Sequence, residues 1–292
     1  DLSVSLSSES VKMHRKLHQK NSELGSSADG NSPRILTINK GGQKLRLFVY
    51  DAATSNKVVP CLLWFHGGGY YAGSADEKFL GPHFTEHAEC MVISVEYSLA
   101  PEYPFPAGLQ DAEFALNWVY QNANRLNIDR DRIAIGGASA GAGLAASLAL
   151  SNRDNKGPEI CFQLLLYPML DNLHDTPSGK IRDHPVWNRR KSLAAWEMYL
   201  NGVPGLGADY YAAPIRTKNL FSLPNTFIAV GEVDLFYDEC LLYAAQLSDC
   251  GVDACIRVYR GVYHGAELVA PSVPICQTMI GDYTNALKKS FG

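Results

Sequence analysis

One stretch near the middle of the chain constrains the fold more than any other, because it frames a single serine with glycines. Residues 132–149 read RIAIGGASAGAGLAASLA. The apolar, β-branched run before Ser139 predicts a strand, and the Ala/Leu-rich run after it predicts a helix. Gly137 and Gly141 complete the pattern G-x-S-x-G, in which neighbours without side chains let strand and helix approach closely. The stretch therefore predicts a nucleophile elbow that exposes the Ser139 hydroxyl above a sheet edge.

A glycine-rich turn follows the first continuous apolar run of the chain. The turn is His66-Gly67-Gly68-Gly69-Tyr70, directly after residues 58–65. In open α/β sheets ligands bind at the carboxyl ends of the strands, where bare backbone amides can point at an oxyanion. A tight turn without function is the other reading. Because turns of this type accompany the nucleophile elbow, we predict an oxyanion loop.

A serine hydroxyl is a weak nucleophile near neutral pH, so it needs a base and a third group that holds the base. Asp234, in FIAVGEVDLFYD, follows one predicted strand, and His264, in YRGVYHGAE, follows the next. The order Ser139, Asp234, His264 is that of an α/β-hydrolase triad. Each residue could instead form a turn or cap a helix, which is the reading preferred for Asp238 and Glu232.

Strand-like and helix-like segments alternate along most of the 292 residues. This alternation predicts one α/β domain over residues 1–292, with a mostly parallel central sheet covered by helices on both faces. An aromatic, Pro-rich stretch between residues 168 and 223 interrupts the rhythm and looks inserted. The expected strands are 34–39, 44–50, 58–65, 90–96, 132–135, 161–167, 226–230 and 254–259, and the expected helices outside the elbow are 109–124, 236–250 and 275–289.

The composition excludes several classes of partner. A net charge of −4 with no long basic run argues against nucleic acid and anionic membranes. No apolar stretch is long enough to span a bilayer, and the first twenty residues lack the apolar core of a secretory signal. Seven cysteines without a C-x-x-C pair suit free thiols in a reducing compartment, and four of them lie in apolar runs expected to be buried: Cys61, Cys90, Cys161 and Cys255. A cytoplasmic location is predicted.

Five motifs in succession carry a resemblance to a known family. HGGGYYAG, EYSLAPEYPFPAGLQDA, GGASAGAG, VGEVDLFYDE and YHGAE resemble the signatures of the hormone-sensitive lipase family of α/β-hydrolase esterases, from about residue 58 to the C-terminus. The resemblance implies an esterase that needs no cofactor. It implies that Ser139 is the nucleophile, Asp234 the acid and His264 the base. It also implies that the backbone N–H groups of Gly68, Gly69 and Ala140 bind the oxyanion.

The resemblance also implies that residues 1–30 and an insertion at 171–213 pack together as a cap over the site. The expected partner is a small-molecule ester, with a homodimer as an option. The sequence departs from the family pattern at two positions. Ala138 replaces the usual Asp before the nucleophile, and Ser98 replaces the usual Arg of the Y-R-L-A-P-E signature. Because losing one partner of a buried pair costs more than losing both, we hypothesise that the two changes are linked.

Two other patterns fit simpler explanations. Residues 83–87 spell H-x-x-E-H, a zinc-peptidase pattern, but no third ligand is evident and a solvated helix face is expected. Residues 141–146 mimic a dinucleotide fingerprint. They begin inside the elbow helix and have no acidic residue at the required distance, so close packing explains their glycines better. No metal site is predicted.

The sequence thus predicts a serine carboxylic ester hydrolase that acts through an acyl-enzyme. The aromatic side chains of Tyr70, Tyr71 and Trp187 suggest an enclosed pocket of a few hundred Å³ for short or medium acyl chains or aryl esters. The same machinery could cleave an amide, formamide or lactam. A non-catalytic receptor on this fold is the third alternative, as in the plant gibberellin receptors, which resemble the family but replace the base histidine.

Overall fold

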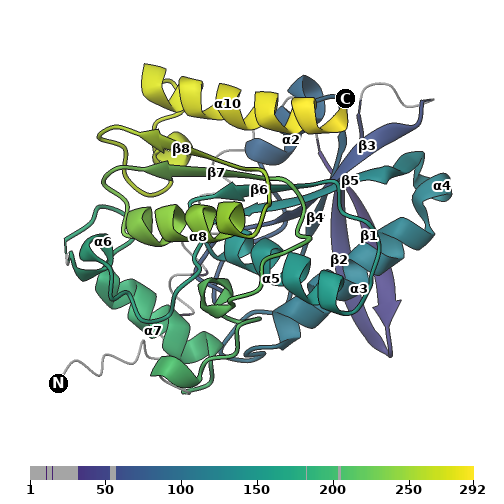
Figure 1. Cartoon of the computed structure of the whole chain (residues 1–292). Helices are drawn as coiled ribbons and strands as arrows, with labels where there is room; N and C mark the ends of the chain where they lie inside the picture. Colours follow the sequence, from purple (N-terminus) through teal and green to yellow (C-terminus); the bar gives the residue numbers. More distant parts are fainter. Residues whose placement is uncertain (1–10, 12–14, 16–31, 53–56, 182, 203–204) are drawn as a thin grey trace.

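A single eight-stranded sheet forms the centre of the protein (Figure 1). The computed structural model describes residues 11, 15, 32–52, 57–181, 183–202 and 205–292. Two strand pairs, β1–β2 and β2–β4, are antiparallel and all others are parallel. In spatial order the strands are β1 (Arg34–Lys40), β2 (Gln43–Tyr50), β4 (Met91–Val95), β3 (Val59–Phe65), β5 (Ile128–Ala138), β6 (Phe162–Leu166), β7 (Thr226–Gly231) and β8 (Ala254–Tyr259).

Helices cover both faces of this sheet (Figure 1). On one face lie α2 (Leu80–His87) and α10 (Pro274–Phe291), and on the other lie α3 (Ala107–Gln121), α5 (Ala140–Asp154) and α8 (Tyr237–Asp249). The predicted fold class, a mostly parallel sheet with helices on both faces, is confirmed. The shorter elements are α4 (Ala123–Leu126), α6 (Pro177–Lys180), α7 (Arg189–Tyr199), α9 (Ala266–Val269) and the 3₁₀ turns η1 (Gly205–Gly207) and η2 (Pro214–Arg216).

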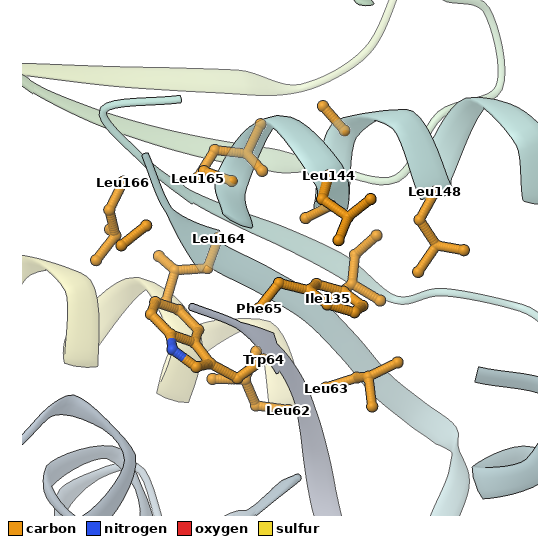
Figure 2. Packing of buried hydrophobic residues seen from close by; sticks show 14 of the residues in the cluster. Leu62, Leu63, Trp64, Phe65, Ile135, Leu144, Leu148, Leu164, Leu165 and Leu166 are labelled. Atoms are coloured by element: carbon orange, nitrogen blue, oxygen red, sulfur yellow. The ribbon is translucent and has the colours of Figure 1, made fainter. Parts of the chain in front are cut away.

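The central strands are apolar on both sides because both sides are covered. All seven residues of β3 are buried. Trp64 packs against Phe84 of α2, with ring centroids 5.5 Å apart. Leu144 and Leu148 of α5 lie over Ile135 of β5, next to Phe65 (Figure 2). The unbroken apolar run of β3 thus follows from its position between two helical layers.

Strand β5 is longer than the sequence predicts. It begins at Ile128, ahead of a charged run that hides the start of the strand from a prediction based on apolar residues. It pairs with β3 at Val59–Ile128 and again at Cys61–Ile133, so five steps of β5 span two steps of β3. The residues between, 129–132, are the charged run DRDR, and they leave the ladder as a bulge. Strand pairing therefore continues across charged residues that sequence periodicity assigns to a loop.

Two further expectations are corrected. The helix expected over 109–124 is divided, because α3 ends at Gln121 and the short α4 is followed by Asn127, which adopts left-handed backbone with φ of 55°. Cys255 is exposed because β8 is the last strand of the sheet and is only partly covered. Cys61 and Cys90 are buried as expected, and Cys161 is half-buried.

The inserted stretch packs against two parts of the α/β body. Ser178 of α6 donates its backbone N–H to Asp238 of α8 at 2.6 Å. Tyr199 of α7 stacks on Tyr70, with ring centroids 3.9 Å apart. Helices α6 and α7 of the inserted stretch therefore lie beside α8 and the glycine-rich turn, respectively. Most of the predicted N-terminal half of the cap lies outside the described residues, but Val11 is buried in the main core and Arg15 contacts the loop after β3.

Position 98, where the family pattern has Arg, lies against a buried carboxylate. The Ser98 backbone N–H donates to Asp111 Oδ2 at 2.8 Å, and Lys40 Nζ lies 2.6 Å from Asp111 Oδ1. Lys40 thus supplies a positive charge beside Asp111. The proposed link between Ser98 and Ala138 stays a prediction.

We expect Asp111→Ala to lower the free energy of unfolding by about 2–4 kcal/mol, because it leaves the partly buried Lys40 ammonium and the Ser98 amide without their acceptor. The matched control is Asp51→Ala, which breaks the exposed Arg34–Asp51 pair and should cost less than about 1 kcal/mol. Urea unfolding of both variants measures the difference. Equal losses would contradict a structural role for Asp111.

Candidate active site

Ser139 occupies a sharp turn between β5 and α5. Its backbone has φ of 57° and ψ of −118°, an unfavourable conformation for a residue with a Cβ. Its N–H donates to Leu166 O of β6 at 2.9 Å, which ties the turn to the sheet. A Cβ on Gly141 would lie 2.0 Å from Phe65 O, and one on Gly137 would lie 2.6 Å from the same oxygen. The predicted elbow is therefore present, and its glycines are required by close approach.

The serine hydroxyl begins a buried chain of hydrogen bonds. His264 Nε2 lies 3.0 Å from Ser139 Oγ, and His264 Nδ1 lies 2.8 Å from Asp234 Oδ2. A carboxylate can only accept, so Nδ1 carries the proton and Nε2 is left to accept from the hydroxyl. Asp234 Oδ1 accepts a second bond from the Phe236 N–H at 2.9 Å. Between 1% and 6% of each of the three residues is exposed.

The topology explains why residues so distant in sequence meet. Asp234 follows β7 and His264 follows β8, and both strands run parallel to β5, which ends at Ala138. Parallel strands bring their carboxyl ends to one edge of the sheet. Gly231 permits the approach of the last loop, since a Cβ there would lie 2.1 Å from Val262 O. The sequence prediction of Ser139, Asp234 and His264 as one cluster agrees with this geometry.

The glycine-rich turn lies next to Ser139. Gly68 and Gly69 have φ of 118° and 61°, and a Cβ on Gly67 would lie 3.5 Å from the Ser139 Cβ. Within the part of the chain that the structure describes, the N–H groups of Gly68, Gly69 and Ala140 donate to no carbonyl or side chain. Ala140 is the first residue of α5, where helix amides are unpaired and the dipole favours an anion. These amides are free to bind a developing oxyanion.

A cavity of about 1390 Å³ opens above Ser139 and His264. Tyr71 and Trp187 line it, and their rings stack at 6.4 Å. Trp187 also covers the glycine-rich turn, since a Cβ on Gly69 would lie 2.5 Å from Trp187 Cη2. The prediction of an enclosed pocket of a few hundred Å³ is wrong, because the observed cavity is larger and extends to the half-exposed side chains of Leu268 and Val269.

Tyr70 does not line this cavity, which corrects the expectation that it contacts substrate. Its ring stacks on Tyr199, and its hydroxyl donates to Met169 O at 3.2 Å, close to Gly143. It packs beneath the glycine-rich turn, between the inserted stretch and α5. Gly143 is required there, because a Cβ would lie 2.3 Å from the Tyr70 hydroxyl oxygen. Close packing thus accounts for the glycines that mimic a dinucleotide fingerprint.

Three residues near the site are not among the site residues predicted from the sequence. Arg15 donates to the carbonyls of Tyr71 and Ala100 at 2.7 Å each and forms an ion pair with Glu102 at 2.7 Å. Tyr167 and Glu267 form a buried hydrogen-bonded pair beside His264. Glu267 ends the YHGAE motif, three residues after the predicted base, but the motif by itself assigns it no role. Contacts of this kind depend on loop conformation rather than on periodicity.

The H-x-x-E-H segment lies on α2. His83 Nε2 lies 3.0 Å from Thr284 Oγ1 of α10, and its ring centroid is 4.3 Å from that of His87. Glu86 and His87 are largely exposed at the helix surface. Across the described ranges, no group of three or more His, Cys, Asp or Glu side chains is arranged to hold a metal ion. No helix among the described residues is both long enough and apolar enough to cross a bilayer.

Comparison with known proteins agrees with this geometry. Residues 62–268 match a family described by the alpha/beta hydrolase fold. Esterase LipI of Mycobacterium tuberculosis is 36% identical over 221 residues, which are 74% of this chain and 68% of the relative. Carboxylesterase NlhH of the same species is 35% identical over 241 residues, 80% of this chain and 74% of the relative. The solved structure of a bacterial heroin esterase superposes with a TM-score of 0.90 at 32% identity, covering 97% and 92% of the two chains.

The chain therefore belongs to the alpha/beta hydrolase family. Within that family it is a hormone-sensitive-lipase-like esterase, and its activity is that of a carboxylic ester hydrolase. The fold and reaction class predicted from the five motifs are confirmed.

We expect Gly141→Ala to lower kcat/KM by at least about a hundredfold, because the new methyl would separate α5 from β3 and move Ser139. Gly281→Ala is the matched control. Gly281 lies in α10, and beyond its own helix no atom lies within 4 Å of the position that a Cβ would take. This variant should keep full activity and gain up to about 1 kcal/mol of stability. Steady-state kinetics and urea unfolding check both. Unchanged kinetics for Gly141→Ala would contradict the close-approach argument.

Proposed function

We propose that Ser139 is the nucleophile of a carboxylesterase reaction, with His264 as general base and Asp234 as the residue that orients it. His264 Nε2 takes the hydroxyl proton while Oγ attacks the ester carbonyl. The carbonyl oxygen gains negative charge and is bound by the amides of Gly68, Gly69 and Ala140. The imidazolium is stabilised by the Asp234 carboxylate. His264 then protonates the leaving alcohol, which departs and leaves an acyl-enzyme.

Hydrolysis of the acyl-enzyme repeats these steps with water. His264 removes a proton from water, the resulting hydroxide attacks the acyl carbonyl, and the same amides bind the second oxyanion. Proton return from His264 to Ser139 Oγ releases the carboxylic acid. One observation carries the proposal: the buried chain from Asp234 through His264 to Ser139, with contacts of 2.8 and 3.0 Å. The same chain argues against a non-catalytic receptor.

Short to medium acyl chains and aryl esters are the proposed substrates. Tyr71 and Trp187 supply an aromatic wall beside Ser139, which suits flat or short apolar groups. The rest of the cavity wall includes charged side chains such as Arg46, Glu96 and Lys78. A long alkyl chain would displace water from these charges at a cost in free energy. Amides, formamides and lactams are the alternative substrates, since the triad and oxyanion amides serve them equally.

We propose a cytoplasmic location, supported by the seven cysteines, each of which is a free thiol in the structure. Cys61, Cys90 and Cys240 are buried in the apolar core. Burial raises the pKa of the Cys90 thiol to about 12, so it is not reactive at neutral pH. Thiols held in this way contribute packing rather than cross-links.

We expect the parent protein to hydrolyse p-nitrophenyl acetate and butyrate, and Ser139→Ala to lose at least about a thousandfold in kcat. Activity should fall steeply for acyl chains beyond about ten carbons in a series that extends to palmitate, because a longer chain would reach the charged part of the cavity wall. EDTA should leave the rates unchanged. Residual activity of Ser139→Ala near the parent level would overturn the nucleophile, and equal rates on palmitate and butyrate would overturn the substrate class.

Trp187→Ala should move the preferred acyl length upward, because removing the indole widens the cavity over Gly69. The control is Trp118→Ala, which removes an indole that lines a separate cavity beside the start of β3 and should leave the length profile unchanged. Ratios of kcat/KM for butyrate, octanoate and palmitate esters measure the profile. An unchanged profile in Trp187→Ala would exclude Trp187 from the acyl site.

A further inference from the structure

A second buried carboxylate lies next to the catalytic histidine. Glu267 belongs to the first turn of α9, which begins two residues after His264, and its side chain is fully buried. Its Oε1 accepts a hydrogen bond of 2.6 Å from the Tyr167 hydroxyl. Its Oε2 is buried and has no hydrogen-bond partner among the described residues. A buried carboxylate with an unsatisfied oxygen is costly, so its retention calls for a reason.

The ring of Tyr167 connects this carboxylate to the base. It forms a T-shaped pair with the imidazole of His264, with centroids 4.7 Å apart and an interplanar angle of 65°. The ring of Phe236 packs on the same imidazole in a T-shape at 5.2 Å. The imidazole is therefore held by rings as well as by its two hydrogen bonds. Of these two rings, that of Tyr167 is fixed in turn by the hydrogen bond from its hydroxyl to Glu267.

The backbone of Tyr167 is also constrained. It follows β6 directly, adopts a φ of 38°, and donates its N–H to Ala229 O at 2.6 Å. A positive φ at an aromatic residue is unfavourable and persists only where the surroundings enforce it. The hydrogen bond to Glu267 fixes the other end of the side chain. Backbone and hydroxyl together determine where the ring lies against His264.

We propose that Glu267 and Tyr167 are positioning residues for the esterase reaction: the hydrogen bond from the Tyr167 hydroxyl to Glu267 holds the phenol ring against His264 and so keeps Nε2 aligned with Ser139 Oγ. This inference rests on the proposed role of His264 as the base. Among the described residues, neither forms a hydrogen bond with Ser139 or His264, although the Tyr167 ring lines the cavity above Ser139. Their contribution lies in restricting rotation of the imidazole, to which proton transfer is sensitive.

Conservative variants separate the hydrogen bond from the charge. Tyr167→Phe keeps the ring and removes the hydroxyl. Glu267→Gln keeps an acceptor oxygen and removes the charge, whereas Glu267→Leu removes both at similar volume. With p-nitrophenyl butyrate we expect Tyr167→Phe and Glu267→Leu each to lower kcat about tenfold with KM within about twofold, and Glu267→Gln to stay within about twofold of the parent. The double variant Tyr167→Phe/Glu267→Leu should be no slower than either single variant.

The matched control is Tyr259→Phe, which breaks a similar bond, from the Tyr259 hydroxyl of β8 to Asp282 of α10 at 2.9 Å; neither residue lines the cavity above Ser139. It should keep the parent kcat. Labelling of Ser139 by a p-nitrophenyl phosphonate should slow in parallel with kcat in Tyr167→Phe, since it uses the same base. If Glu267→Leu does not fold, Tyr167→Phe and Glu267→Gln still decide the question.

A parent-like kcat in Tyr167→Phe would overturn the proposal. Equal losses in Glu267→Gln and Tyr167→Phe would also overturn it, because the charge of Glu267 would then matter instead of its acceptor oxygen. Failure of the underlying function has a different signature. In that case the parent would not hydrolyse the ester at all, or Ser139→Ala would remain active.

Discussion

The contact between α5 and the end of β3 is the constraint on which the site depends. At Gly141 the helix is so close to the Phe65 carbonyl that a single methyl group could not be accommodated. The same closeness places the first amide of the helix beside the glycine-rich turn, so the proposed oxyanion donors and the turn that holds Ser139 have one origin in packing. Ser139 holds an unfavourable φ of 57° there, and its N–H bond to Leu166 anchors the turn to β6. A rigid α/β body therefore holds a strained residue in place for chemistry.

The sequence predicts this part of the molecule well because it is encoded locally. Gly137, Ser139 and Gly141 signal a turn whose geometry has few solutions, and the apolar strands on either side define the sheet. Asp234 and His264 follow from the order of strands, since parallel strands share an edge. By contrast, the charged run 129–132 obscures the length of β5, because the strand continues through a bulge that breaks the apolar pattern.

Side-chain contacts across loops are not predictable in this way. The position of Tyr70 after the glycine-rich turn suggests the substrate cavity, but its positive φ of 64° directs it toward Tyr199 and Met169. The cavity volume depends on how the inserted stretch sits relative to the sheet, which no periodicity reports. Arg15 cannot be placed from the sequence because its partners include two backbone carbonyls, which leave no trace in it.

The two carboxylates near His264 differ in what surrounds them, and this difference assigns their tasks. Asp234 accepts hydrogen bonds on both oxygens, from the imidazole at Oδ2 and from the Phe236 N–H at Oδ1. Glu267 is buried, and burial raises its pKa, although the Tyr167 hydroxyl and the nearby His264 oppose the rise. The hydrogen bond from Tyr167 needs only an acceptor oxygen, so it persists in either protonation state of Glu267. In the proposed mechanism, Glu267 therefore maintains the position of His264 without needing its charge, and Asp234 is the carboxylate hydrogen-bonded to the imidazole.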